Sequence, residues 1–596
     1  MNHMFSRFHI ALILTFTVCT GAALAQNATP TPTPSPAPSV QTQPVDKQNV
    51  QPENLTGVPA IAPNYRSEDR SLPDLGRVGV DMTDQLPLTL HDAITMALEN
   101  NKDIEVSRKN VKIAEYDLQA ARGFYEPRFS GQTYYEKSTT PTISFFTPEV
   151  DKVKGDAFAG NVGIQGYVPK FGSILNVSMN NQRVGTDNLI SIISPQYNSN
   201  LTFSLTQPLF RGRSFDQPRR AIEIAKRNLS LTDTQFRQRT IDIIANVQRA
   251  YWDLTYALRN LQVQRDGVKD AKEQMEHNRR LVNEGQLAPI DIVASETQVA
   301  NFEQAVYEAL NGVGQAENNL KNLISPNREH GIWRESVTPV DSVDLDAPTT
   351  TLTEALETAL QNRPELEINQ AQKDINAIDQ KFFREQNKPQ IDLIASYTSA
   401  GVGGSLNPNF RNPLLQTCID NPTQPQCIAA DQARQTLLNN VGGAGSAVTD
   451  IFTNKYPTFR VGVQFNLPLF GDKTAKAQLG RSLVEGDRLE TQREQIEQTI
   501  QVDVRNALQT LRTAEARLRA AAISRENTTK QYESEQRKLD AGQSDIYKVL
   551  ERQTALTTAR SNELRAQTEV NKAISDLQRA TGNSLKANNV LTMLRK

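Results

Sequence analysis

Residues 243–282 read IIANVQRAYWDLTYALRNLQVQRDGVKDAKEQMEHNRRLV, and side chains of one character recur there every seven residues. One seam consists of Val247, Leu254, Leu261, Val268, Met275 and Val282. A second seam, four residues earlier in each heptad, consists of Ile243, Ala250, Ala257, Gln264 and Ala271. Two such seams are typical of a helix that packs lengthwise on another helix. The pattern predicts a helix over about 218–283, which is about 100 Å long at 1.5 Å per residue and far longer than a compact domain needs.

The second half of the chain repeats this pattern. Its seams consist of Val504, Leu511 and Leu518 beside Ile500, Ala507, Ala514 and Ala521. Three short motifs, Leu90-His91-Asp92-Ala93-Ile94, Pro208-Leu209-Phe210 and Glu284-Gly285-Gln286, return as Leu352-Thr353-Glu354-Ala355-Leu356, Pro468-Leu469-Phe470 and Ala541-Gly542-Gln543. Because their order is kept and their spacing drifts little, we infer a duplicated unit. The predicted segments are a first repeat over 88–325, a linker over 326–350, a second repeat over 351–582 and a C-terminal tail over 583–596.

Each long helix is predicted to end at a glycine, Gly285 or Gly542, because glycine suits a chain reversal after a helix. Helical stretches of about half the length occupy the ranges 90–121, 289–323, 352–383 and 545–580. Two half-length helices stacked end to end match one long helix. Each repeat is therefore expected to form a two-stranded antiparallel coiled coil, although an ordinary coiled-coil rod explains the heptads equally well.

The hydrophobic period changes to two between the opening helix and the long helix of each half. Leu201, Phe203 and Leu205 alternate with polar residues, as do Val461 and Val463. Such strands suit lipid on one face and water on the other, and a soluble sandwich would also alternate. Four strands are expected in the first half, near 128–137, 158–168, 173–184 and 199–207, with a tight turn over 169–172. Two are expected in the second half, near 391–398 and 458–467, around a non-helical insertion over about 401–455.

The N-terminus carries the features of an export signal. Arg7 and His9 precede an apolar run over 10–18, and Ala23-Leu24-Ala25 offers a cleavage site, so residues 1–25 are predicted to be a signal peptide. Lipid attachment at Cys19 is the weaker alternative. Residues 26–87 are expected to be a disordered leader, because Pro, Thr, Ser, Gln and Asn dominate its first part.

Composition excludes several classes of protein. A mean hydropathy of −0.51 without a second long apolar run predicts no membrane-spanning helix. A net charge of −2 argues against a nucleic-acid partner, which needs a basic field. Five His and three Cys offer little material for a metal site, and the few His stand apart from any catalytic grouping. We therefore expect no enzyme activity, no cofactor and no metal.

Taken together, the signal peptide, the repeated opening helix, the strand exit Gln207-Pro208-Leu209-Phe210 and the glycine reversals resemble the TolC-like outer membrane efflux proteins. The resemblance covers about residues 88–582. It implies an α+β membrane protein, in which three copies close one transmembrane β-barrel that continues as a long α-helical coiled-coil barrel in the periplasm. Six strands per chain depart from the simplest family pattern, so the resemblance leaves the number of barrel strands open.

The resemblance further implies a passive outer-membrane channel of a tripartite export system, for efflux or type I secretion. Its partners would be two further copies of the chain, a periplasmic adaptor, an inner-membrane pump of RND, ABC or MFS type, and outer-membrane lipid. The alternative is a coiled-coil structural or adhesin-like surface protein anchored by a barrel. An adhesin should carry a large passenger, and the insertion over 401–455 is too short for one.

Two sets of site residues follow from the resemblance. The helix reversals would face the adaptor, which places Gly285, Leu287, Gly542 and Gln543 at the contact. The pore constriction is expected nearby, at Asp291, which lies six residues after Gly285, and at Asp545, Lys548 and Glu551 in the second half. Threefold symmetry would convert Asp291 or Glu551 into a carboxylate ring, and such rings favour cations. An ordinary exposed helix charge is the alternative for each residue.

The mature chain would keep two cysteines, Cys418 and Cys427. They lie in the insertion of the second half among turn residues, and an oxidising compartment allows them to pair. We predict a disulfide between them, with two free buried cysteines as the alternative.

Overall fold

The computed structural model describes residues 75–143, 150–343, 348–410, 423–468 and 472–590, apart from a few side chains near residue 437. One compact unit begins at Gly76 and contains every described helix and strand. Its helices in the first half are α2 (Leu90–Asn100), α3 (Lys102–Arg122), α4 (Gln217–Asn283) and α5 (Ile290–Ile324). Those of the second half are α6 (Leu352–Asn362), α7 (Pro364–Gln386), α11 (Lys473–Asp540) and α12 (Ile546–Ala580).

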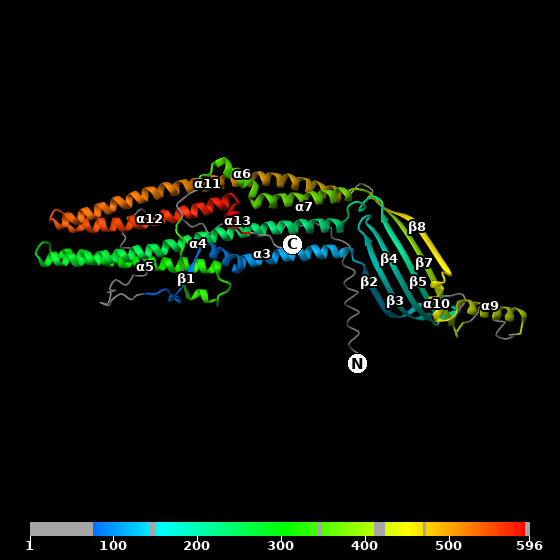
Figure 1. Ribbon diagram of the computed structural model, residues 1–596. Coiled ribbons are helices and arrows are strands. Elements are labelled where there is room, and N and C mark those ends of the chain that lie inside the picture. Colours follow the sequence, from blue (N-terminus) through cyan, green and yellow to red (C-terminus); the bar gives the residue numbers. More distant parts are fainter. Residues whose placement is uncertain (1–74, 144–149, 344–347, 411–422, 469–471, 591–596) are drawn as a thin grey trace, which may run out of the picture. The chain divides into compact units, whose positions relative to one another are not determined.

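The two halves contain the same series of helices, with α4 and α11 spanning 67 and 68 residues and α5 and α12 spanning 35 each. In each half the long helix packs on both half-length helices, α4 on α3 and α5, and α11 on α7 and α12 (Figure 1). This is the predicted antiparallel arrangement. Among the helices in the described ranges, none combines the length and apolar character needed to cross a bilayer.

The seams predicted from the heptads are the packed faces of the long helices. Along α4, Val247 and Leu254 are fully buried, and Ala250 and Ala257 nearly so. On α11 the buried seam residues are Ile500, Val504, Ala507, Leu511 and Ala514. The alanines lie on the side where neighbouring helices approach, because a small side chain permits a short distance between axes.

Both opening helices are broken, which the sequence analysis did not predict. Asn101 separates α2 from α3, and its side-chain oxygen caps α3 by accepting from the backbone N–H of Asp103. The matching break at Arg363 precedes Pro364, which disfavours a helical residue before it. Asn101 donates to the Leu323 carbonyl and Arg363 donates to the Ala580 carbonyl. Each break therefore binds the carbonyl end of the half-length helix in its own half.

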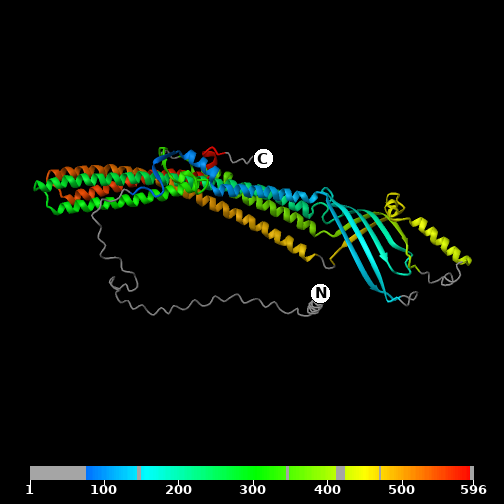
Figure 2. The ribbon, with the colours of Figure 1, turned by 90° about the horizontal axis from the view of Figure 1, so that it is seen from below.

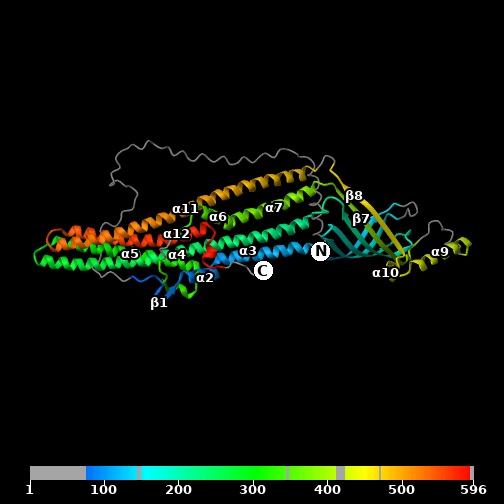
Figure 3. The same ribbon diagram turned by 45° about the horizontal axis from the view of Figure 1, so that its top comes forward.

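The strands form one antiparallel sheet in the order β2-β3-β4-β5-β7-β8. Their bounds are β2 Arg128–Pro141, β3 Lys152–Val168, β4 Ser173–Thr186, β5 Ile193–Pro208, β7 Gln390–Leu406 and β8 Tyr456–Asn466. The four and two strands predicted for the two halves are confirmed. So is the turn between β3 and β4, where Gly172 adopts a φ of +67° and donates to the Val168 carbonyl. The pairing of β5 with β7 joins the two halves (Figure 3).

Register separates the two faces of this sheet, because residues directly opposite each other lie on the same face. One row across all six strands is wholly apolar and consists of Phe129, Ile164, Val177, Phe203, Tyr397 and Phe459. A row on the other face consists of Arg128, Gln165, Asn176, Ser204, Ser396 and Arg460. The apolar face is exposed in this chain, with Phe129 at 73% and Phe459 at 75%.

The insertion between β7 and β8 contains two helices, so the expectation of a non-helical segment over 401–455 is wrong. They are α9 (Pro425–Val441) and α10 (Ala444–Phe452). Figure 2 shows α9 beyond the end of the sheet that lies opposite the long helices. Helix α10 packs on β5 and β7. Ala429, Ala430 and Ala433 favour helix in α9 without creating an apolar stripe, which explains why periodicity missed it.

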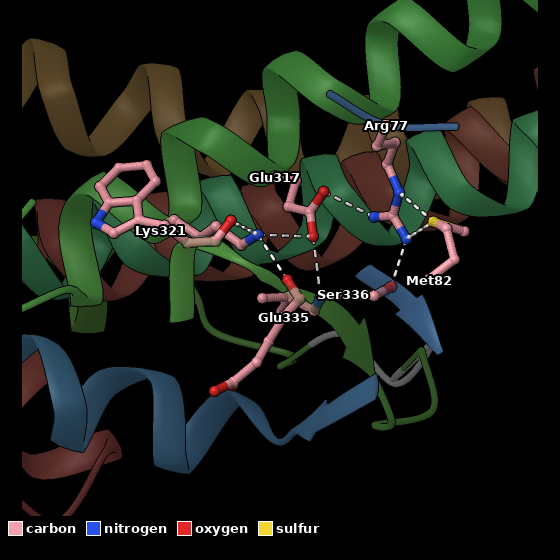
Figure 4. Close-up of polar contacts among 8 residues, drawn as sticks. Arg77, Met82, Glu317, Lys321, Glu335 and Ser336 are labelled. Atoms are coloured by element: carbon pink, nitrogen blue, oxygen red, sulfur yellow. Dashed lines mark hydrogen bonds and ion pairs between the residues drawn. The ribbon is translucent and has the colours of Figure 1, made fainter. Parts of the chain in front are cut away.

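A second, small sheet pairs β1 (Asp81–Leu88) with β6 (Glu335–Pro339) in parallel. The sequence analysis placed no element in 26–87 or 326–350 and missed both strands. Beside this sheet, Arg77 makes an ion pair of 2.7 Å with Glu317 of α5, and Glu317 also contacts the Lys321 ammonium at 3.2 Å (Figure 4). Burial lowers the pKa of Lys321, and the Glu317 carboxylate opposes that shift. The cluster attaches the segment before β1 to α5.

Candidate functional site

The two helix reversals have the same backbone geometry. Gly285 adopts a φ of +80° and donates to the Val282 carbonyl, while the N–H of Gln286 donates to the Leu281 carbonyl at 2.9 Å. Gly542 adopts a φ of +68°, and the equivalent bonds run to the Leu539 and Lys538 carbonyls. This pair of bonds is the Schellman motif, which requires a left-handed residue after the helix. Glycine is therefore needed at both positions for its backbone freedom.

The four residues predicted to contact an adaptor differ in solvent exposure. Gly285, Gly542 and Gln543 are exposed, as an adaptor contact requires. Leu287 is only half-buried, which departs from the fully exposed position expected for it. Its side chain packs on a small apolar cluster of the second half, which consists of Leu539, Ile546, Val549 and Leu550. Leu287 therefore connects the two reversals within one chain, in addition to any contact outside it.

Asp291 lies in the first turn of α5, where its Oδ2 accepts from the backbone N–H of Ala288 at 3.0 Å. A carboxylate at this place satisfies an N–H that lacks a helical partner and interacts favourably with the helix dipole. The Asp291 side chain is half-buried. Stabilising the start of α5 therefore explains why a carboxylate occupies position 291, without any role in a pore.

Asp545 and Lys548 form one unit at the start of α12. Asp545 is the N-cap and accepts from the backbone N–H of Lys548 at 3.0 Å, and its other oxygen lies 2.9 Å from the Lys548 ammonium. The hydrogen bonds from Lys548 hold the pKa of Asp545 below its ordinary value, and the carboxylate raises the pKa of Lys548. The predicted acidic aperture is therefore locally neutral at this point.

Glu551 lies in a groove of about 520 Å³ between the N-terminal parts of α5 and α12. The groove is lined by Ile290, Val293, Ala294, Thr297, Gln298, Tyr547, Leu550, Glu551 and Thr554. Gln298 of α5 donates to Thr554 of α12 at 2.7 Å, so the two halves bind each other along this surface. Asp291 does not line the groove, and the structure brings together only Asp545 and Lys548 among the four predicted constriction residues.

Polar contacts between the halves near the reversals were missed from the sequence. Between the halves, the His277 ring lies 2.9 Å from Asp540, and Gln536 donates to Gln274. Within the first half, Gln274 donates to Asn278, which donates to Ser295 of α5 at 2.8 Å. Asn278 is fully buried. One signal was present, because Asn278 continues the seam of Ala257 and Ala271 at the heptad spacing, and a buried amide in an apolar seam fixes register.

Cys427 is buried in α9 and disulfide-bonded, whereas Cys418 lies outside the described residues. The pairing of Cys427 with Cys418 therefore stays a prediction. Among the residues that the structure does describe, no group of three His, Cys, Asp or Glu side chains is arranged to hold a metal ion.

Comparison with known proteins identifies the family. The sequence profile described as outer membrane efflux protein matches residues 161–325 and 355–583, which is more than half of the chain. The chain therefore belongs to the outer membrane efflux protein family. The family places it in the outer membrane, with an extension into the periplasm, and assigns it to efflux channels rather than enzymes.

Solved outer-membrane channels share the fold. The CmeC channel of Campylobacter jejuni superposes with a TM-score of 0.57 at 15% identity, covering 88% of this chain and 94% of CmeC. The VceC protein of Vibrio cholerae gives 0.54 at 12%, covering 83% and 96%. The open state of the MtrE channel of Neisseria gonorrhoeae gives 0.53 at 17%, covering 87% and 94%. The sequence has no match among curated proteins.

Proposed function

We propose that three copies of this chain close one barrel and form a passive conduit, which receives substrates from an inner-membrane pump through a periplasmic adaptor. The observation that carries this proposal is the sheet. It has six strands, and in the described part of the chain β2 and β8 each pair on one side only. Unpaired strand edges are not tolerated in lipid, and closed single-chain barrels need at least about eight strands.

Three copies would supply three times six strands, an 18-stranded barrel. In that barrel the row from Phe129 to Phe459 would face lipid, and the row from Arg128 to Arg460 would line the lumen. The matching helix series of the two halves supports an internal duplication. It also supports a helical duct, because α4 and α11 are each about 100 Å long at 1.5 Å per residue.

Assembly is the first test. Protein extracted in mild detergent and analysed by mass photometry should have three times the mass of the mature chain, and in planar bilayers it should conduct without an energy source. The edge strand offers a matched pair of variants, Val461→Pro and Val461→Thr. Proline removes a backbone donor from β8, so it should abolish the trimer if that donor pairs between copies, whereas threonine retains it. A stable, conducting monomer would contradict the proposal.

The partners need a separate test. Purified trimer should retain an adaptor of the same cell in a pull-down, and the double variants that replace Gly285 and Gly542 by Trp should lose it. Retention by these variants, with export intact, would show that the reversals do not meet an adaptor.

A further inference from the structure

Helix α10 lies on the apolar face of the sheet. Ser399 of β7 donates to the Ile451 carbonyl of α10 at 2.7 Å. Ser399 is two residues beyond Tyr397, so its side chain lies on the face that carries Phe203 and Phe459. Ala447 and Ile451 are buried where α10 meets β7. The helix therefore covers the face that would meet lipid, close to the end where β7 leaves the sheet.

Strand β7 is shaped to receive this helix. After Ser399, the next positions on the same face are Gly401 and Gly403. A Cβ at Gly401 would lie 1.8 Å from the Ala447 carbonyl oxygen, and a Cβ at Gly403 would lie 2.3 Å from the Gly443 carbonyl oxygen. Both distances are impossible contacts, so the helix backbone occupies the space of two missing side chains. This part of β7 presents no side chain of its own to the membrane.

One flank of α10 carries two apolar side chains that are uncovered in this chain. Val448 and Phe452 are 37% and 75% exposed, and residues four apart lie on one side of a helix. The exposure of Phe452 equals that of Phe459 on the apolar face of β8. Because Ala447 lies against Gly401 and Ile451 against Ser399, Val448 and Phe452 lie beside the part of β7 that has only serine and glycine on this face. They therefore supply apolar surface where β7 has none.

We propose that α10 is an interfacial helix, whose Val448 and Phe452 insert into the headgroup boundary of the outer leaflet. Lipid is the occupant that the geometry favours, because the exposed side of α10 continues the apolar face of the sheet. A second copy of the chain is disfavoured, because α10 packs on β5 and β7, neither of which is an edge strand. Aromatic side chains at this depth are typical of membrane boundaries. The inference requires the sheet to be embedded in the membrane and is independent of pump and adaptor.

Depth-dependent quenching tests the inference on the full trimer. Phe452→Trp protein is reconstituted in phosphatidylcholine vesicles with bromine either near the headgroup or near the middle of the acyl chains. Its added emission should fall more with the shallow bromine than with the deep one. Val448→Trp, one turn earlier, should behave alike. The signal of Trp252 and Trp333 is measured on the parent protein and subtracted.

Two control variants fix the scale. Val463→Trp, near the middle of β8 on the same face, should be quenched at least as strongly by the deep bromine. Tyr547→Trp, exposed on α12 beside the helix reversals, should respond to aqueous iodide and not to lipid. Quenching of Phe452→Trp by iodide alone would overturn the inference, and so would shielding from both quenchers, which would indicate a protein contact. Loss of lipid quenching at Val463 as well would overturn the membrane embedding of the sheet itself.

Discussion

Helices α5 and α12 occupy equivalent places in the two halves, yet their charged residues differ at two points along the helix. Counted from Gly285 and Gly542, the positions of Val313 and Leu320 on α5 match those of Val570 and Leu577 on α12, and all four are buried. Six residues after the glycine, however, α5 has Asp291 and α12 has Lys548.

The second difference lies farther along the helices. Where α5 buries Glu317 and Lys321, α12 has Ile574 and Gln578. The apolar positions set the packing, and packing is common to both halves. The charged residues pair with neighbours that are present in only one half. Glu317 of α5 pairs with Arg77 next to β6, and Lys548 of α12 pairs with the N-cap Asp545. Matching helix geometry in the two halves therefore does not imply matching charges at equivalent positions.

The feature that both halves share should give the largest effect when it is changed. Replacing Gly285 and Gly542 together by Trp should abolish export, because a bulky side chain projects from each exposed reversal. The trimer should remain folded, since nothing lies within 4 Å of a Cβ at either glycine. Substrate accumulation in cells measures export, and mass photometry measures assembly.

The corresponding double alanine variant separates bulk from strain. It carries the same left-handed backbone cost, about 1–2 kcal/mol per residue, without the large side chain. Export should persist in it. Normal efflux by the double Trp variant would show that the reversals are not part of the surface that export requires.

The buried charges of α5 are tested by giving that helix the residues of α12. Glu317→Ile alone leaves Arg77 and Lys321 buried without their anion, which should cost about 3–5 kcal/mol. The variant that combines Arg77→Leu, Glu317→Ile and Lys321→Gln should recover most of this loss, because a buried ionic cluster is often replaceable by apolar side chains. Thermal unfolding of the trimer in detergent compares the three proteins. Equal Tm values for parent and single variant would show that the cluster is energetically neutral.

Removing the carboxylates near the helix reversals should have a smaller effect, and the property affected should be ion selectivity. Neutralising Asp291→Asn together with Glu551→Gln should raise the single-channel conductance or weaken the cation preference, if these carboxylates line the narrowest part of the duct. Glu308→Gln, an exposed carboxylate farther along α5, is the control and should leave currents unchanged. Unchanged currents in the double variant would show that both residues are ordinary surface charges.

The smallest expected effect is a pH dependence at the second reversal. Because Lys548 lowers the pKa of Asp545 from its ordinary value of 3.8, the cap adds stability above that value. The contribution is lost as the pH falls through the lowered pKa of the folded state. Hydrogen exchange of residues 541–550, corrected for intrinsic rates, should therefore show protection that persists below pH 3.8. Lys548→Gln should move its loss to higher pH, and an unmoved midpoint would contradict the pairing.

Periodicity predicted the elements that repeat one apolar face along their length. The long helices were found because that face is packed in each turn, and the six strands of the large sheet because apolar and polar residues alternate in them, although their apolar face is exposed in this chain. The reversals were located by glycines in motifs that occur in both halves. The breaks at Asn101 and Arg363 were missed because a single residue makes each of them, although Pro364 gave a signal for the second. The short strands β1 and β6 were missed because their partners lie far apart in the sequence, and Arg77 meets Glu317 across 240 residues.

The candidate site could be predicted only in outline. The offset of 257 residues located both reversals and the charged positions after them. That Leu287 would pack on the second half depends on how the two halves approach each other, and no spacing within one half contains that information. The pairing of Asp545 with Lys548 is different, because both residues lie at the start of α12, three residues apart.

The parallel pairing of β1 with β6 makes the biogenesis of this protein sequential. A chain that leaves the inner membrane N-terminus first, as the predicted signal peptide over 1–25 would require, presents Arg77 and β1 long before residues 335–339 arrive. Closing so long a loop costs little more free energy than closing a short one, but high contact order slows folding. The first half therefore cannot complete its fold until more than half of the polypeptide has been translocated, and β1 must wait unpaired in the periplasm until then.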